Sequence, residues 1–140
     1  MAAQPRVLIV DDEERFRTTL AKMLTAQGLT VATAASGPEA LESLRSQPCD
    51  VILLDIRMPK MGGVETLAEI KNIVPEAEVI ILTGHASVDA AMEIMKLGAH
   101  DYLLKPCPLD ELLLKIDNAF EKKLEREKRR KVELERGAGG

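Results

Sequence analysis

Five side chains that could do chemistry follow short aliphatic runs of this sequence: Asp11, Asp12, Asp55, Thr83 and Lys105. If these runs are parallel strands of an open α/β sheet, their carboxyl ends lie along one edge, where ligands bind at a topological switch point. We therefore expect three carboxylates, one hydroxyl and one ammonium group to converge on a single site.

Such a cluster is unfavourable unless positive charge compensates it. Two unit charges about 4 Å apart repel by about 4 kcal/mol at an effective dielectric constant near 20. The Lys105 ammonium and a divalent cation would relieve this repulsion. Mg²⁺ suits such a site because it takes hard oxygen ligands, keeps several waters and is typically held by one or two carboxylates plus a phosphate oxygen. The residue types therefore predict a magnesium-assisted phosphate site.

The composition is typical of one folded domain. The chain has 140 residues, of which 46% are apolar, so it can bury a sizeable core. Its net charge is −4, and residues 121–136 hold eight Lys and Arg against five Asp and Glu, so neither part has the charge of a nucleic-acid binder. No apolar run reaches the roughly 20 residues of a membrane helix. The two cysteines, Cys49 and Cys107, are sparse and lack metal-ligand spacing, so we expect both to be reduced thiols. Reduced thiols are typical of the cytoplasm, where we expect this protein.

Strand-like segments alternate with helix-like segments along the chain. The expected strands cover residues 6–10, 29–34, 50–54, 78–82 and 101–104. Helix-like segments of about 10 to 15 residues separate them, which is the pattern of βαβ units and a parallel sheet. The segment 29–34 is the least aliphatic of the clear runs, so we expect it at an edge of the sheet.

Capping signals mark the ends of several expected helices. The first helix, over about residues 13–27, should end at Gly28. The second should begin at Ser36, with Glu39 three residues on as in a capping box. The fourth should begin at Ser87 and end at Gly98.

Apolar stripes at helical spacing predict the buried face of each helix. In the fourth helix the stripe is Val88, Ala91, Met92 and Met95, and we expect its methionines to fill the core. The fifth helix begins after Pro108, and its stripe ends at Leu124. Beyond that point a helix could continue, but little apolar surface would hold it to the domain.

Four motifs together resemble the receiver domain of bacterial two-component response regulators, over about residues 5–122. The resemblance implies a doubly wound, flavodoxin-like parallel sheet of five strands in the order 2-1-3-4-5, with helices on both faces. The motifs are Val-Asp-Asp-Glu (10–13), Leu-Asp-Ile-Arg-Met-Pro-Lys-Met-Gly-Gly (54–63), Leu-Thr-Gly-His-Ala (82–86) and Gly-Ala-His-Asp-Tyr-Leu-Leu-Lys-Pro (98–106).

The resemblance also implies a role for each site residue. Asp55 would accept a phosphoryl group from a phosphohistidine on a sensor histidine kinase. Asp12 would bind Mg²⁺ directly and Asp11 largely through water. Asp55 and the backbone carbonyl of Arg57 would complete the protein ligands. Thr83 would hydrogen-bond the phosphoryl group, and Lys105 would pair with it.

A switch would follow from these contacts. When Thr83 moves toward the phosphoryl group, Tyr102 would turn inward, which would reshape the face formed by the fourth helix, fifth strand and fifth helix. The resemblance implies a cis Lys105-Pro106 peptide bond. Arg57 and His85 would border the path of hydrolytic water and tune the lifetime of the phosphate. His100 is expected at the surface.

The expected organisation is a receiver domain over residues 1–122 and a charged helical extension with a flexible tail over 123–140. The chain looks like the receivers of nitrogen-regulation-type transcriptional activators. Its expected partners are a sensor kinase, an output domain or downstream protein, and a second phosphorylated copy. No enzymatic activity beyond slow self-dephosphorylation, and no direct nucleic-acid or membrane binding, is expected.

Other functions stay open at this point. A magnesium-dependent phosphohydrolase could use the same acids and lysine, but no general acid or substrate-gripping cap is evident. A stand-alone phosphorelay intermediate is a further alternative. An inert domain with a degenerate site is less consistent with the sequence, because every expected site residue is present. Nucleotide binding is not expected, because Gly62-Gly63 lacks the spacing of a nucleotide-binding loop.

Overall fold

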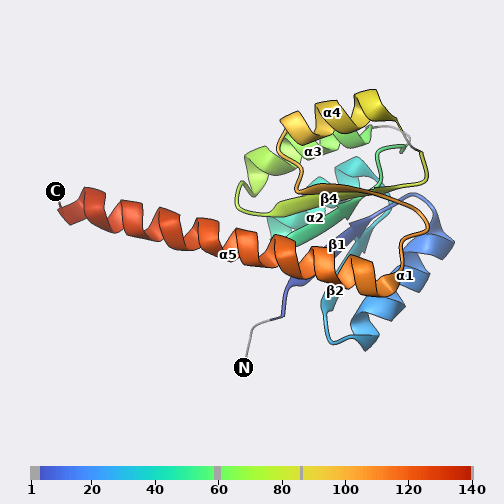
Figure 1. The fold of residues 1–140 in the computed structure, drawn as a ribbon, viewed down its shortest axis with the longest axis horizontal. Helices are drawn as coiled ribbons and strands as arrows, with labels where there is room; N and C mark the ends of the chain where they lie inside the picture. Colours follow the sequence, from blue (N-terminus) through green and yellow to red (C-terminus); the bar gives the residue numbers. More distant parts are fainter. Residues whose placement is uncertain (1–3, 59–60, 86, 140) are drawn as a thin grey trace.

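One parallel sheet organises the molecule (Figure 1). The computed structural model describes residues 4–58, 61–85 and 87–139, so Pro59, Lys60 and Ala86 of the matched motifs lie outside the described residues. The five strands pair in parallel in the order β2-β1-β3-β4-β5, as predicted. They are β1 (Arg6–Val10), β2 (Thr30–Ala34), β3 (Val51–Leu54), β4 (Glu78–Thr83) and β5 (Asp101–Leu104).

The burial of each strand follows its place in the sheet. All residues of β3 and β4 are buried, and β1 is buried apart from its first residue. These continuous aliphatic runs are what a parallel sheet covered on both faces requires. β2 is more exposed and pairs only with β1, so the prediction of an edge strand is confirmed.

Five helices cover the two faces of the sheet. Those on one face, α1 and α5, pack on alternate strand residues such as Val7 and Ile9, and those on the other, α2, α3 and α4, pack on Leu8 and Val10. Because successive strand side chains point to opposite faces, the sheet has two separate hydrophobic cores. The helices are α1 (Glu14–Ala26), α2 (Gly37–Ser46), α3 (Gly63–Ile73), α4 (Val88–Lys96) and α5 (Leu109–Gly139).

The predicted caps are confirmed, with one difference of detail. Gly28 and Gly98 end α1 and α4 with φ of 91° and 100°, in the left-handed region that favours glycine. The Ser87 hydroxyl accepts a hydrogen bond from the Ala90 N–H. Ser36 likewise caps α2, but the Glu39 carboxylate accepts from the N–H of Ala35 rather than of Ser36.

The predicted core face of α4 is wrong. Met92 and Met95 are 55% and 44% exposed, Val88 is exposed still further, and Ile94 is the buried residue of this helix. The helical spacing of the stripe predicts a core face, but spacing does not determine whether another element covers that face. In this fold α4 turns Ile94 to the sheet and leaves an apolar strip on the surface.

The last helix leaves the body of the domain. α5 is continuous over 31 residues, and its buried positions Leu112, Ile116 and Ala119 all lie in its first half. Its second half extends past the sheet (Figure 1). Within the described ranges, the helices are all too short or too polar to cross a membrane.

Candidate functional site

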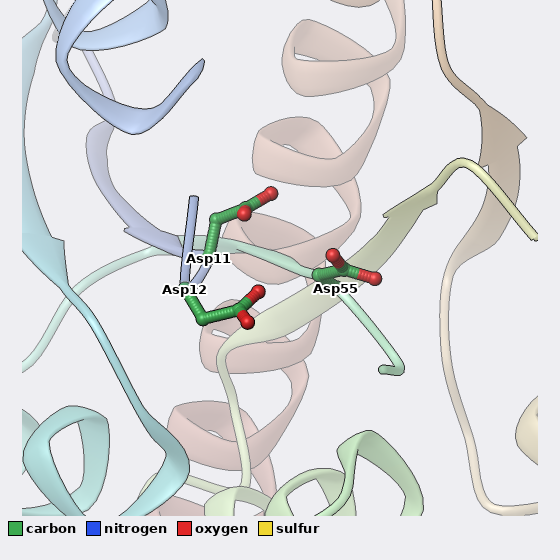
Figure 2. Close-up of side chains that lie close together, drawn as sticks. All are labelled: Asp11, Asp12 and Asp55. Carbon is green, nitrogen blue, oxygen red and sulfur yellow. The ribbon is translucent and has the colours of Figure 1, made fainter. Parts of the chain in front are cut away.

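Two central strands bring the three carboxylates together at the carboxyl edge of the sheet. The Asp55 N–H donates to the Val10 carbonyl and the Asp11 N–H to the Ala34 carbonyl, so pairing continues one residue beyond the strands. One carboxylate oxygen from each of Asp11, Asp12 and Asp55 lies within 4.8 Å of the others. Figure 2 shows the three side chains beyond the ends of β1 and β3. These strands flank the point where the strand order reverses, so the predicted convergence of the acids is confirmed.

Asp11 is a buried residue whose carboxylate oxygens both accept hydrogen bonds. Oδ1 accepts from the Glu13 N–H at 2.9 Å, and Oδ2 accepts from Lys105 Nζ at 2.6 Å. Its backbone carbonyl accepts from Arg17 Nη1 at 2.8 Å. Asp11 is thus held in place by contacts of its own.

Asp12 differs from its neighbour in being exposed. Among the described residues, its carboxylate accepts no hydrogen bond and forms no ion pair. Of the two consecutive acids, Asp12 is therefore the one with oxygens available to a cation.

Asp55 is buried at the end of β3 but only loosely held. Its Oδ1 accepts from the Arg57 N–H at 3.2 Å, and its Oδ2 lies 3.4 Å from Lys105 Nζ. Both distances are at the long end for hydrogen bonds. Oδ2 of Asp55 therefore faces the Lys105 ammonium without a short hydrogen bond.

Lys105 carries the positive charge of the site. Its Nζ lies between the carboxylates of Asp11 and Asp55, with Glu13 Oε1 3.8 Å away. It also lies 4.0 Å from the centre of the Phe16 ring, a cation–π contact. The Lys105-Pro106 peptide bond is cis, as the resemblance implied.

The pKa values of Asp11 and Lys105 are shifted by burial and by the interaction between the two groups. Burial raises the pKa of Asp11, although the hydrogen bond and charge of Lys105 act in the opposite sense. Burial lowers the pKa of Lys105, but its hydrogen bond to Asp11 and the nearby acidic charges outweigh burial and raise that pKa. Lys105 is therefore an ammonium at neutral pH.

Thr83 and Tyr102 are connected through the backbone of one residue. The buried Thr83 hydroxyl accepts a hydrogen bond from the His85 N–H at 3.3 Å. The Tyr102 hydroxyl donates to the His85 carbonyl at 2.8 Å. Because β4 and β5 pair, with the Lys105 N–H donating to the Thr83 carbonyl, the lysine and the threonine are also fixed to each other.

The donor set fits a small, hard divalent cation. The converging atoms are carboxylate oxygens, which Mg²⁺ prefers, and Asp12 leaves part of the site open to water and phosphate oxygens. One lysine faces four nearby acids, since Glu13 joins the three aspartates. A bound divalent cation would offset this excess of negative charge.

Several supporting residues were missed by the sequence analysis. Phe16 of α1 contacts Lys105, which is 89 positions away, so nothing local pairs the two; Arg17 contacts the nearby Asp11 carbonyl, but no sequence pattern marks that contact. The packing role of Gly63 was likewise not predicted. A Cβ there would lie 2.4 Å from Ile56 Cα, so glycine lets α3 start against the loop after Asp55. The signal in the sequence was a glycine directly before the apolar stripe that begins at Val64.

The two candidate tuning residues and His100 lie outside this cluster. The side chains of Arg57 and His85 are exposed, and their roles stay predictions. The expectation that His100 lies at the surface is wrong. It is half-buried and its Nδ1 is fully buried, because it precedes β5 at the opposite edge of the sheet, next to Glu78.

Comparisons with known proteins match the site and the fold. A family model, the response regulator receiver domain, matches residues 7–117. The transcriptional regulatory protein ZraR of Klebsiella oxytoca is 45% identical over 117 residues, which are 84% of this chain and 26% of that protein. The DNA-binding transcriptional regulator NtrC of Escherichia coli (strain K12) is 41% identical over 128 residues, 91% of this chain and 27% of that protein. The chain thus spans about a quarter of the length of these relatives.

A solved structure gives the same result in three dimensions. The beryllofluoride-activated NtrC4 receiver domain dimer superposes with a TM-score of 0.79 at 40% identity, over 84% of this chain and 98% of that one. The predicted fold and family are therefore confirmed. The chain is a member of the response regulator receiver domain family.

Proposed function

We propose that Asp55 is the phosphoryl acceptor of this receiver domain and that a sensor histidine kinase is the donor. The observation that carries the proposal is the place of the Asp55 carboxylate, buried between the Lys105 ammonium and two further acids. An aspartate in such a place is a competent nucleophile because positive charge next to it offsets the charge of the incoming phosphoryl group.

The transfer is an in-line displacement. Asp55 Oδ2 attacks phosphorus, the bond from phosphorus to the donor imidazole nitrogen breaks, and that nitrogen keeps the electron pair. Lys105 then moves from Asp11 toward the phosphoryl oxygens, since it is already within 3.4 Å of Asp55. Water later hydrolyses the acyl phosphate, and we infer no enzymatic activity beyond this slow self-dephosphorylation.

We assign the cation-binding role first to Asp12. Its carboxylate is exposed, whereas both oxygens of Asp11 already accept hydrogen bonds. Asp11 would thus act through water, and Asp55 and the Arg57 carbonyl would complete the protein ligands. Bound Mg²⁺ would neutralise charge on the phosphoryl oxygens.

The switch acts through Thr83 and His85. When the Thr83 hydroxyl turns to the phosphoryl group, it ceases to accept from the His85 N–H. The loop that carries His85 then shifts, and Tyr102 loses its acceptor at the His85 carbonyl. An inward turn of Tyr102 would change the surface formed by α4, β5 and α5. Arg57 and His85, exposed beside the acceptor and the threonine, would tune the phosphate lifetime.

The changed surface has the character of a protein contact. The helix α4, which exposes Met92 and Met95, packs on the side of the sheet on which Tyr102 also packs. The similar NtrC4 receiver was solved as a dimer in its beryllofluoride-activated form. We infer that this chain also dimerises on phosphorylation and signals, in the cytoplasm, to an output domain of a transcriptional regulator like those of its relatives.

The acceptor is tested with a small phosphodonor. Incubation with Mg²⁺ and acetyl phosphate should add one acid-stable, base-labile phosphoryl group, read by mass spectrometry. Asp55→Asn should abolish this labelling, whereas Asp50→Asn, at the other end of β3, should not. Labelling that survives Asp55→Asn would refute the assignment.

A further inference from the structure

A second charged cluster lies at the amino edge of the sheet, opposite the phosphorylation site. Glu78, the first residue of β4, is fully buried, although a carboxylate is rarely buried without a partner. Arg126 Nη1 of α5 lies 2.8 Å from its Oε1. The contact is an ion pair, and among the described residues neither oxygen of Glu78 accepts a hydrogen bond. Arg126 forms the closest ion pair with it, and the half-buried Lys71 ammonium of α3, which donates to the Ala77 carbonyl, also acts on it electrostatically.

Two further ion pairs flank this contact. Lys123 Nζ lies 2.7 Å from Asp50 Oδ1, and Arg130 pairs with Glu76. Lys123, Arg126 and Arg130 are three and four residues apart, so they lie on one face of α5. All three acids lie just before β3 or at the start of β4. A basic face of the helix thus meets an acidic edge of the sheet.

His100 borders the same buried carboxylate. Its Nδ1 lies 4.0 Å from Glu78 Oε2 and, within the described part of the chain, has no hydrogen-bond partner. Its backbone N–H donates to the Val79 carbonyl at 2.7 Å, so β5 pairing holds it there. Its imidazole is therefore a reporter of the charge around Glu78.

We propose that the amino edge of the sheet is a docking site for the chain's own segment 123–130, with buried Glu78 as its anchor. The folded receiver unit would then end near Arg130 rather than at residue 122. Residues with little apolar surface would be held to the domain by charge, and α5 would leave the sheet in a fixed direction. This role is separate from phosphorylation, because its groups lie at the other end of the strands.

Glu78 and Arg126, the two partners of the central ion pair, differ in burial. Glu78 is fully buried, whereas the Arg126 side chain is 39% exposed. Removing Arg126 takes the ion-pair partner from a buried carboxylate, which is destabilising even with the Lys71 ammonium nearby, while removing Glu78 leaves a guanidinium that can reach water. Replacing both by apolar residues of similar volume is often nearly neutral. The predicted ranking of variants is therefore specific to this geometry.

Urea unfolding of four variants of the full chain tests the ranking. Arg126→Met should raise the unfolding equilibrium constant about tenfold to a hundredfold, at the low end for a buried pair because Arg126 is partly in water. Glu78→Met should raise it less, and Glu78→Met/Arg126→Met should recover most of the loss. The control Arg129→Met, on the exposed side of α5, should change it by no more than about twofold. Equal effects of Arg126→Met and Arg129→Met, or no recovery in the double variant, would overturn the proposal.

The His100 imidazole gives an independent readout by NMR. The charged groups around it are Glu78 of β4, Asp101 of β5, and Lys115 and Lys122 of α5. Arg126→Met should raise the pKa of His100, since the Glu78 carboxylate would then lack its guanidinium, and Arg129→Met should not. An unchanged pKa of His100 in Arg126→Met would contradict the proposal that Glu78 anchors segment 123–130 through Arg126.

The same samples separate docking within one chain from docking onto a second copy. Unfolding of the parent chain should not depend on protein concentration if segment 123–130 docks on its own domain. Unfolding that becomes more difficult at higher concentration, with the dependence lost in Arg126→Met, would show that a second copy supplies the segment and would overturn the proposal as stated.

Discussion

The Tyr102 hydroxyl donates a hydrogen bond to the backbone carbonyl of His85 and so ties β5 to the loop after β4. The backbone N–H of His85 in turn donates to the Thr83 hydroxyl. One peptide segment therefore connects the residue that would detect the phosphate with the aromatic side chain that would report it.

Thr83→Ala should uncouple phosphorylation of Asp55 from the movement of Tyr102. We expect phosphorylation by acetyl phosphate to remain nearly normal, because the hydroxyl is not the nucleophile. NMR shifts around Tyr102 on addition of beryllofluoride should be much smaller than in the parent. Thr83→Ser, which keeps the hydroxyl, is the matched control, and equal shifts in Thr83→Ala and the parent would remove this coupling.

Asp12→Ala should weaken Mg²⁺ binding more than about tenfold relative to the parent, and more than Asp11→Asn does. The Asp12 carboxylate is exposed and has no hydrogen-bond partner among the described residues, whereas both Asp11 oxygens already accept hydrogen bonds. Asp11→Asn keeps an oxygen for the Glu13 N–H. Titration of Mg²⁺ with and without acetyl phosphate measures both. The reverse ranking would mean that the two roles are exchanged.

Gly63→Ala should destabilise the domain by about 1–3 kcal/mol, as overpacking does, because its Cβ would lie 2.4 Å from Ile56 Cα in the backbone after Asp55. Gly84→Ala is the control, since a Cβ there meets nothing within 4 Å. Urea unfolding at pH 7 compares them. Equal stability of the two variants would show that the loop after Asp55 yields without cost.

The exposed strip of α4 should be the surface through which activated copies associate. Met92→Glu should prevent the dimerisation that we expect on addition of beryllofluoride, because it puts charge into an apolar contact. Met23→Glu, on α1 and 40% exposed, should leave it intact. Sedimentation with and without the phosphate mimic decides this, and dimers of Met92→Glu would assign the contact to a different face.

Stability should fall in mild acid because of His100. Burial, which outweighs the attraction of Glu78, holds the pKa of His100 below its ordinary 6.5, so the unfolded chain binds this proton more tightly than the native state does. The contribution is fully present above pH 6.5 and is lost as the pH falls through the lower native pKa. His100→Gln should flatten this part of the stability profile and His85→Gln should not; two parallel profiles would exclude His100 as the cause.

The order of elements and the identity of the site were predictable from local sequence. Aliphatic runs of four or five residues predict buried parallel strands, and strand ends of a parallel sheet share one edge. Asp11, Asp12, Asp55 and Thr83 follow such runs, and Lys105 follows the shorter segment 102–104 and precedes Pro106, so their types and positions were enough to predict a site. Caps such as Ser87 and Gly98 involve only neighbours within one helical turn, which explains why they too were predicted.

Contacts between distant residues were decided only by the tertiary structure. The apolar stripe of α4 was visible, but whether a partner covers Met92 depends on how the helix is set against the sheet. Glu78 and Arg126 are 48 positions apart, and nothing local distinguishes that arginine from Arg129. Periodicity describes which residues share a face of one element. Which faces meet, and which charge then becomes buried, depends on the packing of several elements at once.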